Sequence, residues 1–380
     1  MAFMGYRRKD GRVGIRNHVA IVSTVLCSST VTGKIAQATG AAAITHEGGC
    51  GELGLEKEHT ERMLKGVMMH PNVGAVLVVG LGCEQISAQL LSQACDGKPA
   101  QFVNIQKAGG TTAAVEYGIR IVREMIDENK TTERQSADLS ELIVATQCGS
   151  SDTGSGIASN PAVGAVADKV VEGGGTVLLG ETAGLYGAAG ALAKRGVSAE
   201  VRDRIIEITD AIERHYSRMG KSIKEANPTP GNIEGGLTTL VEKALGGVRK
   251  GGTKAIQGVL RPGEMVTGKG LWVMDTSLGI SASVTDMLAG GAQIMLYTTG
   301  LGSPLGFPIA PVVKITATKE TMQSLSEIID FDASPIMSGE ENIEECGSRL
   351  LDYVLTVANG KLTSAEKLGN EVFAIGKIAV

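Results

Sequence analysis

The sequence contains few aromatic residues and no long hydrophobic run. Of its 380 residues, 3% are aromatic and one is Trp, whereas 52 are Gly. An interior with so few rings must be built mainly from Val, Ile, Leu and Ala, with glycine turns between the elements, and this favours α/β architecture. The longest apolar runs, such as 74–80 and 176–180, have the length of strands and fall short of the roughly 20 residues that span a membrane. We therefore expect no membrane segment.

A strong excess of one charge and a cysteine-rich scaffold are also missing. The net charge of −5 gives no general attraction to nucleic acid or to anionic membranes, which favours a small-molecule partner. Six cysteines in a chain of this length are too few for a disulfide scaffold and are expected to be thiols. The N-terminus passes directly into the charged run 7–10, without the apolar segment of a secretory signal. These features predict a cytoplasmic protein.

Short apolar runs alternate along the chain with stretches of helical periodicity. This alternation predicts repeated βα units in two Rossmann-like α/β domains with mostly parallel sheets. We place the first domain at residues 1–135 and the second at 136–380, because the polar run 129–138 has the composition of a linker. The predicted strands are 19–25, 41–45, 75–79, 101–105, 142–146, 176–179, 271–275, 293–298 and 311–316. The predicted helices are 56–69, 112–128, 200–218, 281–288 and 342–358. Two prolines and a glycine predict that 227–232 is irregular.

Four cysteines follow predicted strands, where ligands bind in an open α/β sheet. They are Cys27, Cys50, Cys83 and Cys148, and the last three are flanked by glycine. A single buried cysteine is usually an inert hydrophobic residue, but three at equivalent strand ends indicate a shared role. Thiolates with a nearby imidazole suit iron or zinc better than Mg²⁺ or Ca²⁺. We therefore predict Cys50, Cys83, Cys148 and His46 as metal ligands. A single ion and a [4Fe-4S] cluster with one open iron both remain possible.

Several groups at the same strand ends are candidates for proton transfer. His46 precedes a strand-end cysteine by four residues, and it is either a structural histidine or a ligand or base. Asp152 and Glu181 fall just past strand ends, and Glu84 follows the next cysteine along. Asp152 and Glu181 are each either a helix cap, a solvated acid or a catalytic acid–base group. We take His46, Glu84, Asp152 and Glu181 as catalytic candidates.

Arginines and glycine-rich loops offer contacts for an anionic substrate. Guanidinium groups pair with carboxylates in a bidentate way, although a solvated basic terminus is the alternative for the N-terminal arginines. The loops 231–236 and 298–304 present backbone N–H groups, although tight turns also require glycine. The candidate substrate contacts are Arg7, Arg8, Arg12, Arg16, Asn232 and Thr299. No G-x-G-x-x-G follows the first predicted strand, so a dinucleotide site is not supported.

Taken in order, several segments resemble the altronate and galactarate dehydratase family over nearly the whole chain. The matching segments are Gly5-Tyr6-Arg7-Arg8, Asp10-Gly11-Arg12-Val13-Gly14, Arg16-Asn17, Gly80-Leu81-Gly82-Cys83-Glu84, Gln147-Cys148-Gly149, Ser151-Asp152, Ser155-Gly156, Asn160-Pro161-Ala162-Val163-Gly164, Pro230-Gly231-Asn232, Gly235-Gly236-Leu237, Glu242-Lys243-Ala244-Leu245-Gly246, Thr298-Thr299-Gly300 and Gly339-Glu340-Glu341. The resemblance implies an Fe²⁺-dependent hydro-lyase that converts an aldonate or aldarate to its 2-keto-3-deoxy acid. An enzyme of this kind is also expected to form a homo-oligomer.

The resemblance also implies a partner and two alternatives. Full-length members carry a small N-terminal domain, whereas here the Gly-Tyr-Arg segment begins at residue 5, which implies a separate small subunit. The related sulfolactate sulfo-lyases are similar in this split arrangement. We expect water elimination, because this chain carries Cys50 and Cys83, which the sulfo-lyase branch is expected to lack. Elimination of sulfite from sulfolactate and a non-catalytic scaffold subunit are the alternatives. Leu301, where many relatives have Arg, and the small segment 181–186 favour a shorter or less hydroxylated substrate.

Overall fold

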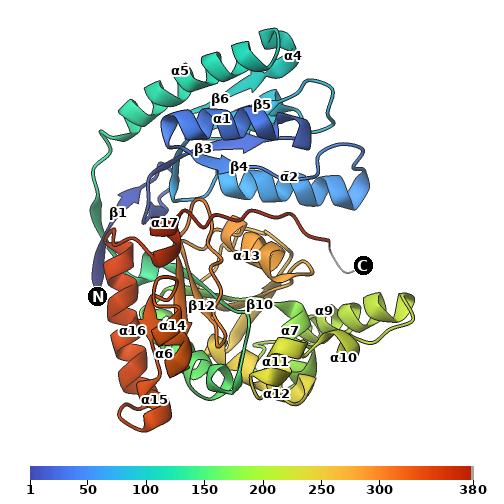
Figure 1. Cartoon of the computed structure of the whole chain (residues 1–380), viewed down its shortest axis with the longest axis vertical. Helices are drawn as coiled ribbons and strands as arrows, with labels where there is room; N and C mark the ends of the chain where they lie inside the picture. The colour runs from blue at the N-terminus through green and yellow to red at the C-terminus, as the bar shows by residue number, and fades with distance from the viewer. Residues whose placement is uncertain (378–380) are drawn as a thin grey trace.

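The computed structural model describes residues 1–377 and contains two parallel sheets with helices on their faces (Figure 1). The first sheet has the order β4-β3-β5-β6. Its strands are β3 (His18–Ser23), β4 (Ala42–Ile44), β5 (Val73–Gly80) and β6 (Ala100–Asn104). Helices α1 (Ser29–Thr39) and α5 (Thr111–Asn129) pack on one face, and α2 (Gly54–Met68) packs on the other. Every residue of β5 is buried, as expected for a strand covered on both faces.

The second sheet is larger and has the parallel order β10-β11-β9-β8-β12-β13-β14. Its strands are β8 (Ile143–Cys148), β9 (Thr176–Leu179), β10 (Ile256–Leu260), β11 (Gly270–Met274), β12 (Ile294–Thr298), β13 (Val312–Thr316) and β14 (Phe331–Asp332). Side chains alternate between its faces, since Val144 and Ala145 lie in different core clusters. Helices α6 (Asn160–Glu172) and α16 (Ile343–Ala358) cover one face, and α13 (Ile280–Ala289) covers the face toward the first sheet. The two Rossmann-like α/β units predicted from the sequence are therefore confirmed.

A third, antiparallel sheet is formed by residues from both predicted domains. Strand β1 (Ala2–Arg7) pairs with β2 (Val13–Gly14) and with β7 (Gln135–Asp138). The predicted linker is therefore wrong at 135–138, because pairing with β1 satisfies the backbone of a strand whose side chains are mostly exposed. Phe3, Val13 and Ile15 also pack in the same core cluster as the second sheet.

The two units share one hydrophobic cluster that includes residues of α2 and α13. The helices approach closely at Gly66 of α2, where a Cβ atom would come within 2.4 Å of the main-chain oxygen of Ala289. Only glycine permits this approach without a shift of the backbone. The packing holds the carboxyl ends of both sheets in a fixed relation.

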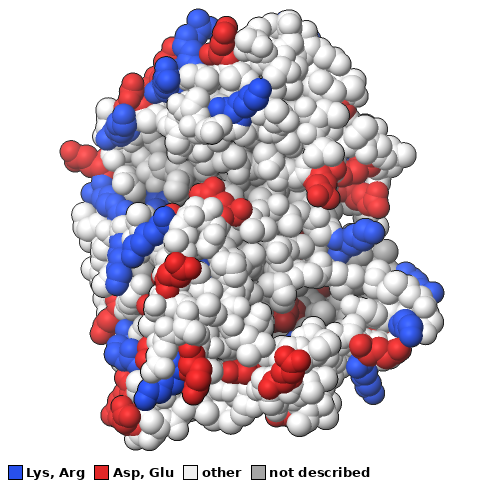
Figure 2. All heavy atoms as spheres, viewed as in Figure 1, with Lys and Arg blue, Asp and Glu red and all other residues white. Residues whose placement is uncertain are grey.

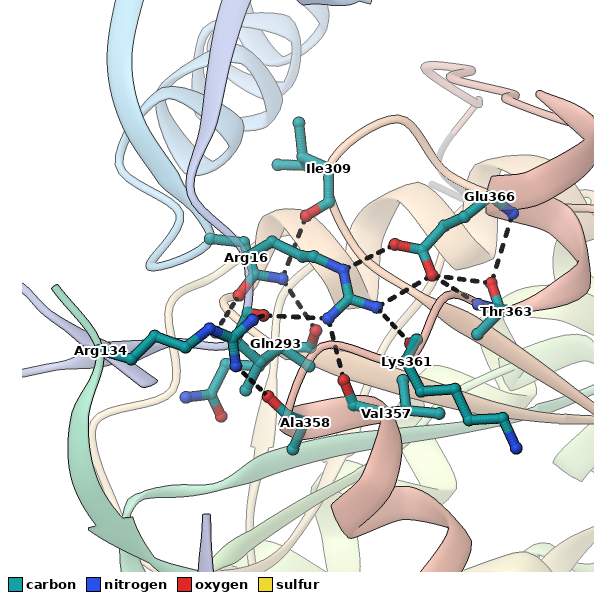
Figure 3. A network of polar contacts seen from close by, with 11 residues as sticks. Arg16, Arg134, Gln293, Ile309, Val357, Ala358, Lys361, Thr363 and Glu366 are labelled. Atoms are coloured by element: carbon teal, nitrogen blue, oxygen red, sulfur yellow. Dashed lines mark hydrogen bonds and ion pairs between the residues drawn. The ribbon is translucent and has the colours of Figure 1, made fainter. Parts of the chain in front are cut away.

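A buried polar network reinforces the joint between the units (Figure 3). Arg16 Nε lies 2.7 Å from Glu366 Oε1, and Arg16 Nη1 donates to the main-chain oxygen of Val357 at 2.9 Å. Arg134 donates to the main-chain oxygens of Ile15 and Ala358, and Figure 3 shows it beside Arg16. These residues come from segments that are distant in sequence, so the network fixes the N-terminal region against the C-terminal helices.

The segment 227–232 contradicts its prediction as irregular structure. Helix α11 (Pro230–Glu234) begins inside it, with Thr229 as N-cap and Pro230 in the first turn. Proline is compatible with this position, because the first N–H groups of a helix need no partner within the helix.

The remaining elements connect these layers. They are α3 (Ala88–Gln93), α4 (Ile105–Ala108), α7 (Thr182–Leu185), α8 (Ala189–Ala193), α9 (Ala199–Arg218), α10 (Ile223–Ala226), α12 (Leu240–Gly247), α14 (Lys319–Ser324), α15 (Pro335–Ser338), α17 (Ser364–Leu368), a π-helical turn at Ser155–Ser159 and 3-10 turns at Leu26–Ser28, Leu139–Glu141, Tyr186–Ala188 and Val248–Gly251. No helix within residues 1–377 is long and apolar enough to cross a membrane. On the face shown in Figure 2, basic and acidic side chains are interspersed.

Candidate active site

Three ionisable side chains meet in the interior beyond the carboxyl ends of β8 and β9. Cys148, at the end of β8, donates from Sγ to Glu181 Oε2 at 3.1 Å. Lys250 Nζ donates to Cys148 Sγ at 2.9 Å and lies 3.6 Å from Glu181 Oε2. The Lys250 side chain is 1% exposed. We call these three residues the lysine cluster.

The lysine cluster is electrically neutral when it holds one cation, one carboxylate and one thiol. Burial lowers the pKa of Lys250, but Cys148 and Glu181 outweigh burial and raise it overall. Burial is the main cause that raises the pKa of Cys148. The Cys148 Sγ atom therefore lies between a carboxylate and an ammonium group in a site largely closed to water.

Asp152 stands four residues after Cys148 in the chain and accepts several hydrogen bonds. Its Oδ1 accepts from the Ser155 N–H at 2.7 Å and from the Ser155 hydroxyl at 2.8 Å, and its Oδ2 accepts from the Thr318 hydroxyl. A Cβ atom at Gly300 would come within 2.0 Å of the Asp152 carboxyl carbon. The carboxylate is therefore held between glycine main chain and hydroxyl donors, which fix its orientation.

The backbone around these groups is in unusual conformations. Ser150 has φ of 50° and Glu181 has φ of 69°, and they are the only non-glycine residues with positive φ among residues 1–377. The π-helical turn Ser155–Ser159 begins a few residues after Ser150. Such conformations cost free energy and gather at functional sites, so they point to this edge of the second sheet.

The two predicted substrate contacts from the glycine-rich loops also lie near this edge. Asn232 Nδ2 donates to the main-chain oxygen of Ser151 at 2.9 Å, and its Oδ1 accepts from Lys243 Nζ at 2.9 Å. The Thr299 hydroxyl accepts from the Gly302 N–H at 3.1 Å. Both side chains are buried and bonded to the protein, so they shape the loops around Asp152.

His46 lies at the carboxyl edge of the first sheet, after β4. Its Nε2 is 3.1 Å from the main-chain oxygen of Ser23, and its Nδ1 accepts from the Gly48 N–H at 3.2 Å. Burial lowers its pKa, and the ring is neutral with Nε2 as the donor. Both ring nitrogens are therefore engaged by the backbone, and ligation of a metal would break one of these bonds.

Three cysteines and Glu84 lie in the loops at this same edge. Cys27, Cys50 and Cys83 are exposed, and the loops of Cys50 and Cys83 are joined by a 3.2 Å hydrogen bond from Gly51 N–H to Gln85 Oε1. Glu84 accepts from the Thr24 hydroxyl and from the Gly82 N–H. The first-sheet loops thus carry thiols, whereas the second-sheet edge carries the buried charges.

The predicted metal-ligand set is not gathered in this structure. Within residues 1–377, no group of three or more His, Cys, Asp and Glu side chains lies close enough to hold a metal ion. The thiols of Cys50 and Cys83 fit iron by donor chemistry, but His46 is bonded to the backbone and Cys148 is held by Lys250. The four residues therefore do not fit one ion as they lie.

The four N-terminal arginines lie away from these strand ends. Arg7 pairs with Glu141, Arg12 with Asp10 and Arg16 with Glu366, and Arg8 donates to Asn17 and to main-chain oxygens. Arg16 precedes β3, so it lies at the amino end of the first sheet. At about 3.3 Å per residue, the length of β3 separates this end from the carboxyl edge by roughly 20 Å. The structure does not bring the arginines together with the predicted metal ligands or with Asp152.

A cavity of about 800 Å³ opens between the two units. It is lined by the loop 45–52 with His46, by α2 with His59, by His215 of α9 and by the C-terminal segment 373–377. This segment runs between the two units (Figure 1) and is tied to the second one, since Leu278 N–H donates to the Lys377 main-chain oxygen at 2.9 Å. The cavity therefore borders the carboxyl edge of the first sheet, and its wall is made by both units.

Asp286 of α13 contacts Ser277, which in turn contacts His59 of the cavity wall. Its burial predicts that the stability of the protein depends on pH. Its Oδ2 accepts from the Ser277 N–H at 2.6 Å, and burial raises its pKa from 3.8 to about 7. Because the folded state holds the Asp286 proton more tightly than the unfolded state does, this group contributes its full stabilisation of the folded state below about pH 4. The stabilisation is lost as the pH rises to about 7. The unfolding free energy of Asp286→Asn, measured in urea relative to that of the natural chain, is therefore expected to be higher at about pH 8 than at about pH 5. An equal difference at both pH values would show that Asp286 is charged throughout.

Comparison with known proteins identifies the family. Residues 5–130 match the model described as D-galactarate dehydratase/altronate hydrolase, second domain, and residues 139–380 match D-galactarate/altronate dehydratase, C-terminal. The chain belongs to this family of lyases. The resemblance drawn from the sequence motifs is confirmed.

Three family relatives differ in how much of their own length the chain covers. The (2R)-sulfolactate sulfo-lyase subunit beta of Chromohalobacter salexigens is 38% identical over 99% of the chain and 97% of its own length. Altronate dehydratase of Bacillus subtilis is 32% identical over 100% of the chain and 78% of its own length. Galactarate dehydratase (L-threo-forming) of Escherichia coli is 34% identical over 94% of the chain and 73% of its own length.

Lys250 is the member of the site that the sequence did not indicate. It stands in the run Arg249-Lys250-Gly251-Gly252, whose composition is typical of an exposed turn. Its burial depends on the contact of Val248–Gly251 with α6 and β9, which places the side chain under Cys148. No local signal distinguishes this lysine from a solvated one.

Proposed function

We propose that this lyase removes water from a sugar-derived 2,3-dihydroxy acid and forms a 2-keto-3-deoxy acid. The observation that carries the proposal is the lysine cluster at the carboxyl edge where α/β sheets bind ligands, with Asp152 in the loop that follows Cys148. Elimination needs a base for the proton on C2 and an acid or cation for the hydroxyl that leaves C3. The second-sheet edge offers both kinds of group in one place.

In this proposal each group has a role that follows from its contacts. The Asp152 carboxyl group takes the C2 proton. Lys250 is a buried cation and stabilises the negative charge that develops on the substrate, or gives a proton to the leaving hydroxyl. Glu181 and Cys148 hold the lysine in place and keep it charged. The enol then gains a proton at C3 and becomes the keto acid, so one water is released for each product.

A panel assay tests the reaction. The purified chain is incubated with aldonates, aldarates and sulfolactate, and the keto acid and sulfite formed are measured separately. Keto acid from an aldonate or aldarate without sulfite supports the proposal. Turnover of none of these acids by the complete enzyme would contradict it and would favour a scaffold subunit.

Sulfite elimination from sulfolactate is the second candidate, and one observation favours it. The chain matches the sulfo-lyase subunit over 97% of that protein's length, whereas the two dehydratases above extend well beyond the matched region. The groups of the site serve either leaving group, since both reactions remove a proton beside a carboxylate. Sulfite as the product would replace the first proposal by this one.

A separate small subunit is part of the same proposal. The relative from Chromohalobacter salexigens is named as a subunit beta, and we propose that this chain also works with a smaller polypeptide. Activity that rises when the smaller protein is added back would support the subunit, and full activity of the chain by itself would contradict it. The predicted homo-oligomer is measured in the same preparations by light scattering.

Iron remains a proposal that rests on donor chemistry at Cys50 and Cys83. An iron ion would supply a Lewis acid for the leaving group when bound. We expect Cys83→Ser to lose bound iron together with turnover, measured as iron and acid-labile sulfide after anaerobic purification. Cys95→Ser, which changes a buried thiol of the same unit, is the control. Iron with sulfide would identify a cluster and iron without sulfide a single ion, whereas unchanged iron in Cys83→Ser would remove this residue from the site.

A further inference from the structure

Three buried polar atoms at the interdomain cavity have no hydrogen-bond partner within residues 1–377. They are His59 Nδ1, Glu52 Oε2 and Ser29 Oγ, and all three residues line the cavity. Buried side-chain polar atoms in native proteins are nearly always paired. Such atoms on one cavity wall therefore point to a ligand that supplies the missing hydrogen bonds.

His59 is held rigidly by its other ring nitrogen. Its Nε2 lies 3.3 Å from the Ser277 hydroxyl, and the residue is 3% exposed. Burial lowers the pKa of His59 to about 4, against a smaller opposite effect of the Gly376 main chain. The ring is therefore neutral, and Nδ1 either accepts or donates one hydrogen bond, depending on the tautomer.

Glu52 is fixed in the same way by one of its oxygens. Its Oε1 accepts from the Gly49 N–H at 2.8 Å, which leaves Oε2 as the unpaired atom. Glu52 also raises the pKa of both His46 and His59, so its carboxyl group lies near both imidazoles. A hydroxyl group can donate to this carboxylate and exchange a hydrogen bond with the imidazole.

The cavity is also close to the lysine cluster. Ser277, which contacts His59, follows β11, whereas Glu181 follows β9 and Cys148 ends β8. These three strands are neighbours in the order β11-β9-β8. At the usual spacing, two strand intervals correspond to about 10 Å.

We infer that the interdomain cavity binds the hydroxylated portion of a polyhydroxy carboxylate, with Glu52 and His59 bonding to its hydroxyl groups. The inference rests on the proposed function, because it assigns this wall to the substrate of that reaction. A carboxylate beside Glu52 would be repelled, so the hydroxyl-bearing carbons face this wall. The apolar side chains of Phe373 and Ile375 line the cavity as well and exclude water from the bound carbons.

The experiment follows the histidine rings directly. The full-length protein, with ¹⁵N-labelled histidine, is titrated with the acid that is turned over fastest, or with D-galactarate if no acid is turned over. The sequence has 5 histidines, so loss of one set of signals in His59→Asn assigns His59. Succinate, which has two carboxylates and no hydroxyl, is the control ligand.

We expect the hydroxy acid to shift the His59 signals and succinate to leave them unchanged. Glu52→Gln is expected to weaken binding about tenfold, the effect of one lost hydrogen bond to a charged group. Glu58→Gln, at an exposed position of α2 outside the cavity lining, is the matched control and is expected to bind as the natural chain does. Equal shifts with both acids, no shift with either, or unchanged affinity in Glu52→Gln would overturn the inference.

Turnover in the same samples separates the two proposals. Turnover without a shift at His59 would overturn the cavity assignment and leave the proposed reaction intact. A shift with the hydroxy acid but no keto acid and no sulfite would support the cavity assignment and contradict the reaction.

Discussion

Replacement of Lys250 by Met is expected to lower kcat/KM for elimination by roughly 10³-fold, because the buried cation that stabilises the developing charge is lost. The same change leaves Glu181 buried without its cation. Breaking a buried pair in this way costs about 3 kcal/mol or more of unfolding free energy. Both quantities are measured on the purified variant, by initial rates over a range of substrate concentrations and by urea unfolding.

Two further variants separate catalysis from stability at this position. Lys250→Met combined with Glu181→Gln removes the unpaired charge and is expected to recover much of the stability but none of the activity. Lys314→Met is the matched control, since Lys314 is also a buried lysine but donates to the main-chain oxygens of Leu305 and Val312. It is expected to lose stability and keep its activity per folded molecule. Near-normal kcat/KM in Lys250→Met would remove the lysine from the mechanism.

The second large effect is expected at the joint between the units. Arg16→Met leaves Glu366 without its cation. The two side chains form a largely buried ion pair, in which Arg16 is 7% and Glu366 16% exposed. We expect a loss of about 3 kcal/mol in the unfolding free energy. Because Arg16 lies at the amino end of the first sheet, KM of the folded variant is expected to be unchanged.

This result also tests the role that the sequence assigned to Arg16. A large rise in KM, with stability retained, would show that Arg16 binds the substrate carboxylate after all. Arg7→Met is the matched control, because Arg7 pairs with Glu141 on the surface. It is expected to leave the urea midpoint nearly unchanged, since exposed ion pairs contribute little.

Repeating apolar runs predicted the strands well because their periodicity is a local property. Thr176–Leu179 forms the predicted strand with the same bounds, and α9 differs from its predicted range by one residue. Strand β7 was missed because its pairing with β1 comes from a segment about 130 residues away. The short helix at Pro230–Glu234 was missed because proline was taken only as a breaker, whereas it is also favoured in a first helical turn.

In the candidate site, too, local features were predicted from the sequence and long-range contacts were not. The positions of Cys148, Asp152 and Glu181 just beyond strands were visible in the sequence, since parallel strands end at one edge of a sheet. Which of them meet was decided by strand order, which the sequence does not contain. The order β9-β8-β12 brings Cys148 next to Glu181, and the turn 248–251 adds Lys250.

The sequence by itself determined the α/β class, the strand ends and the family, because these depend on local periodicity and on motifs read in order. Tertiary structure alone decided the pairing of charges. It placed Arg16 against Glu366 and Lys250 against Cys148, because contacts between residues more than 100 positions apart are fixed by packing of the two units. For the same reason the cavity wall with Glu52 and His59 became visible only when both units were in place.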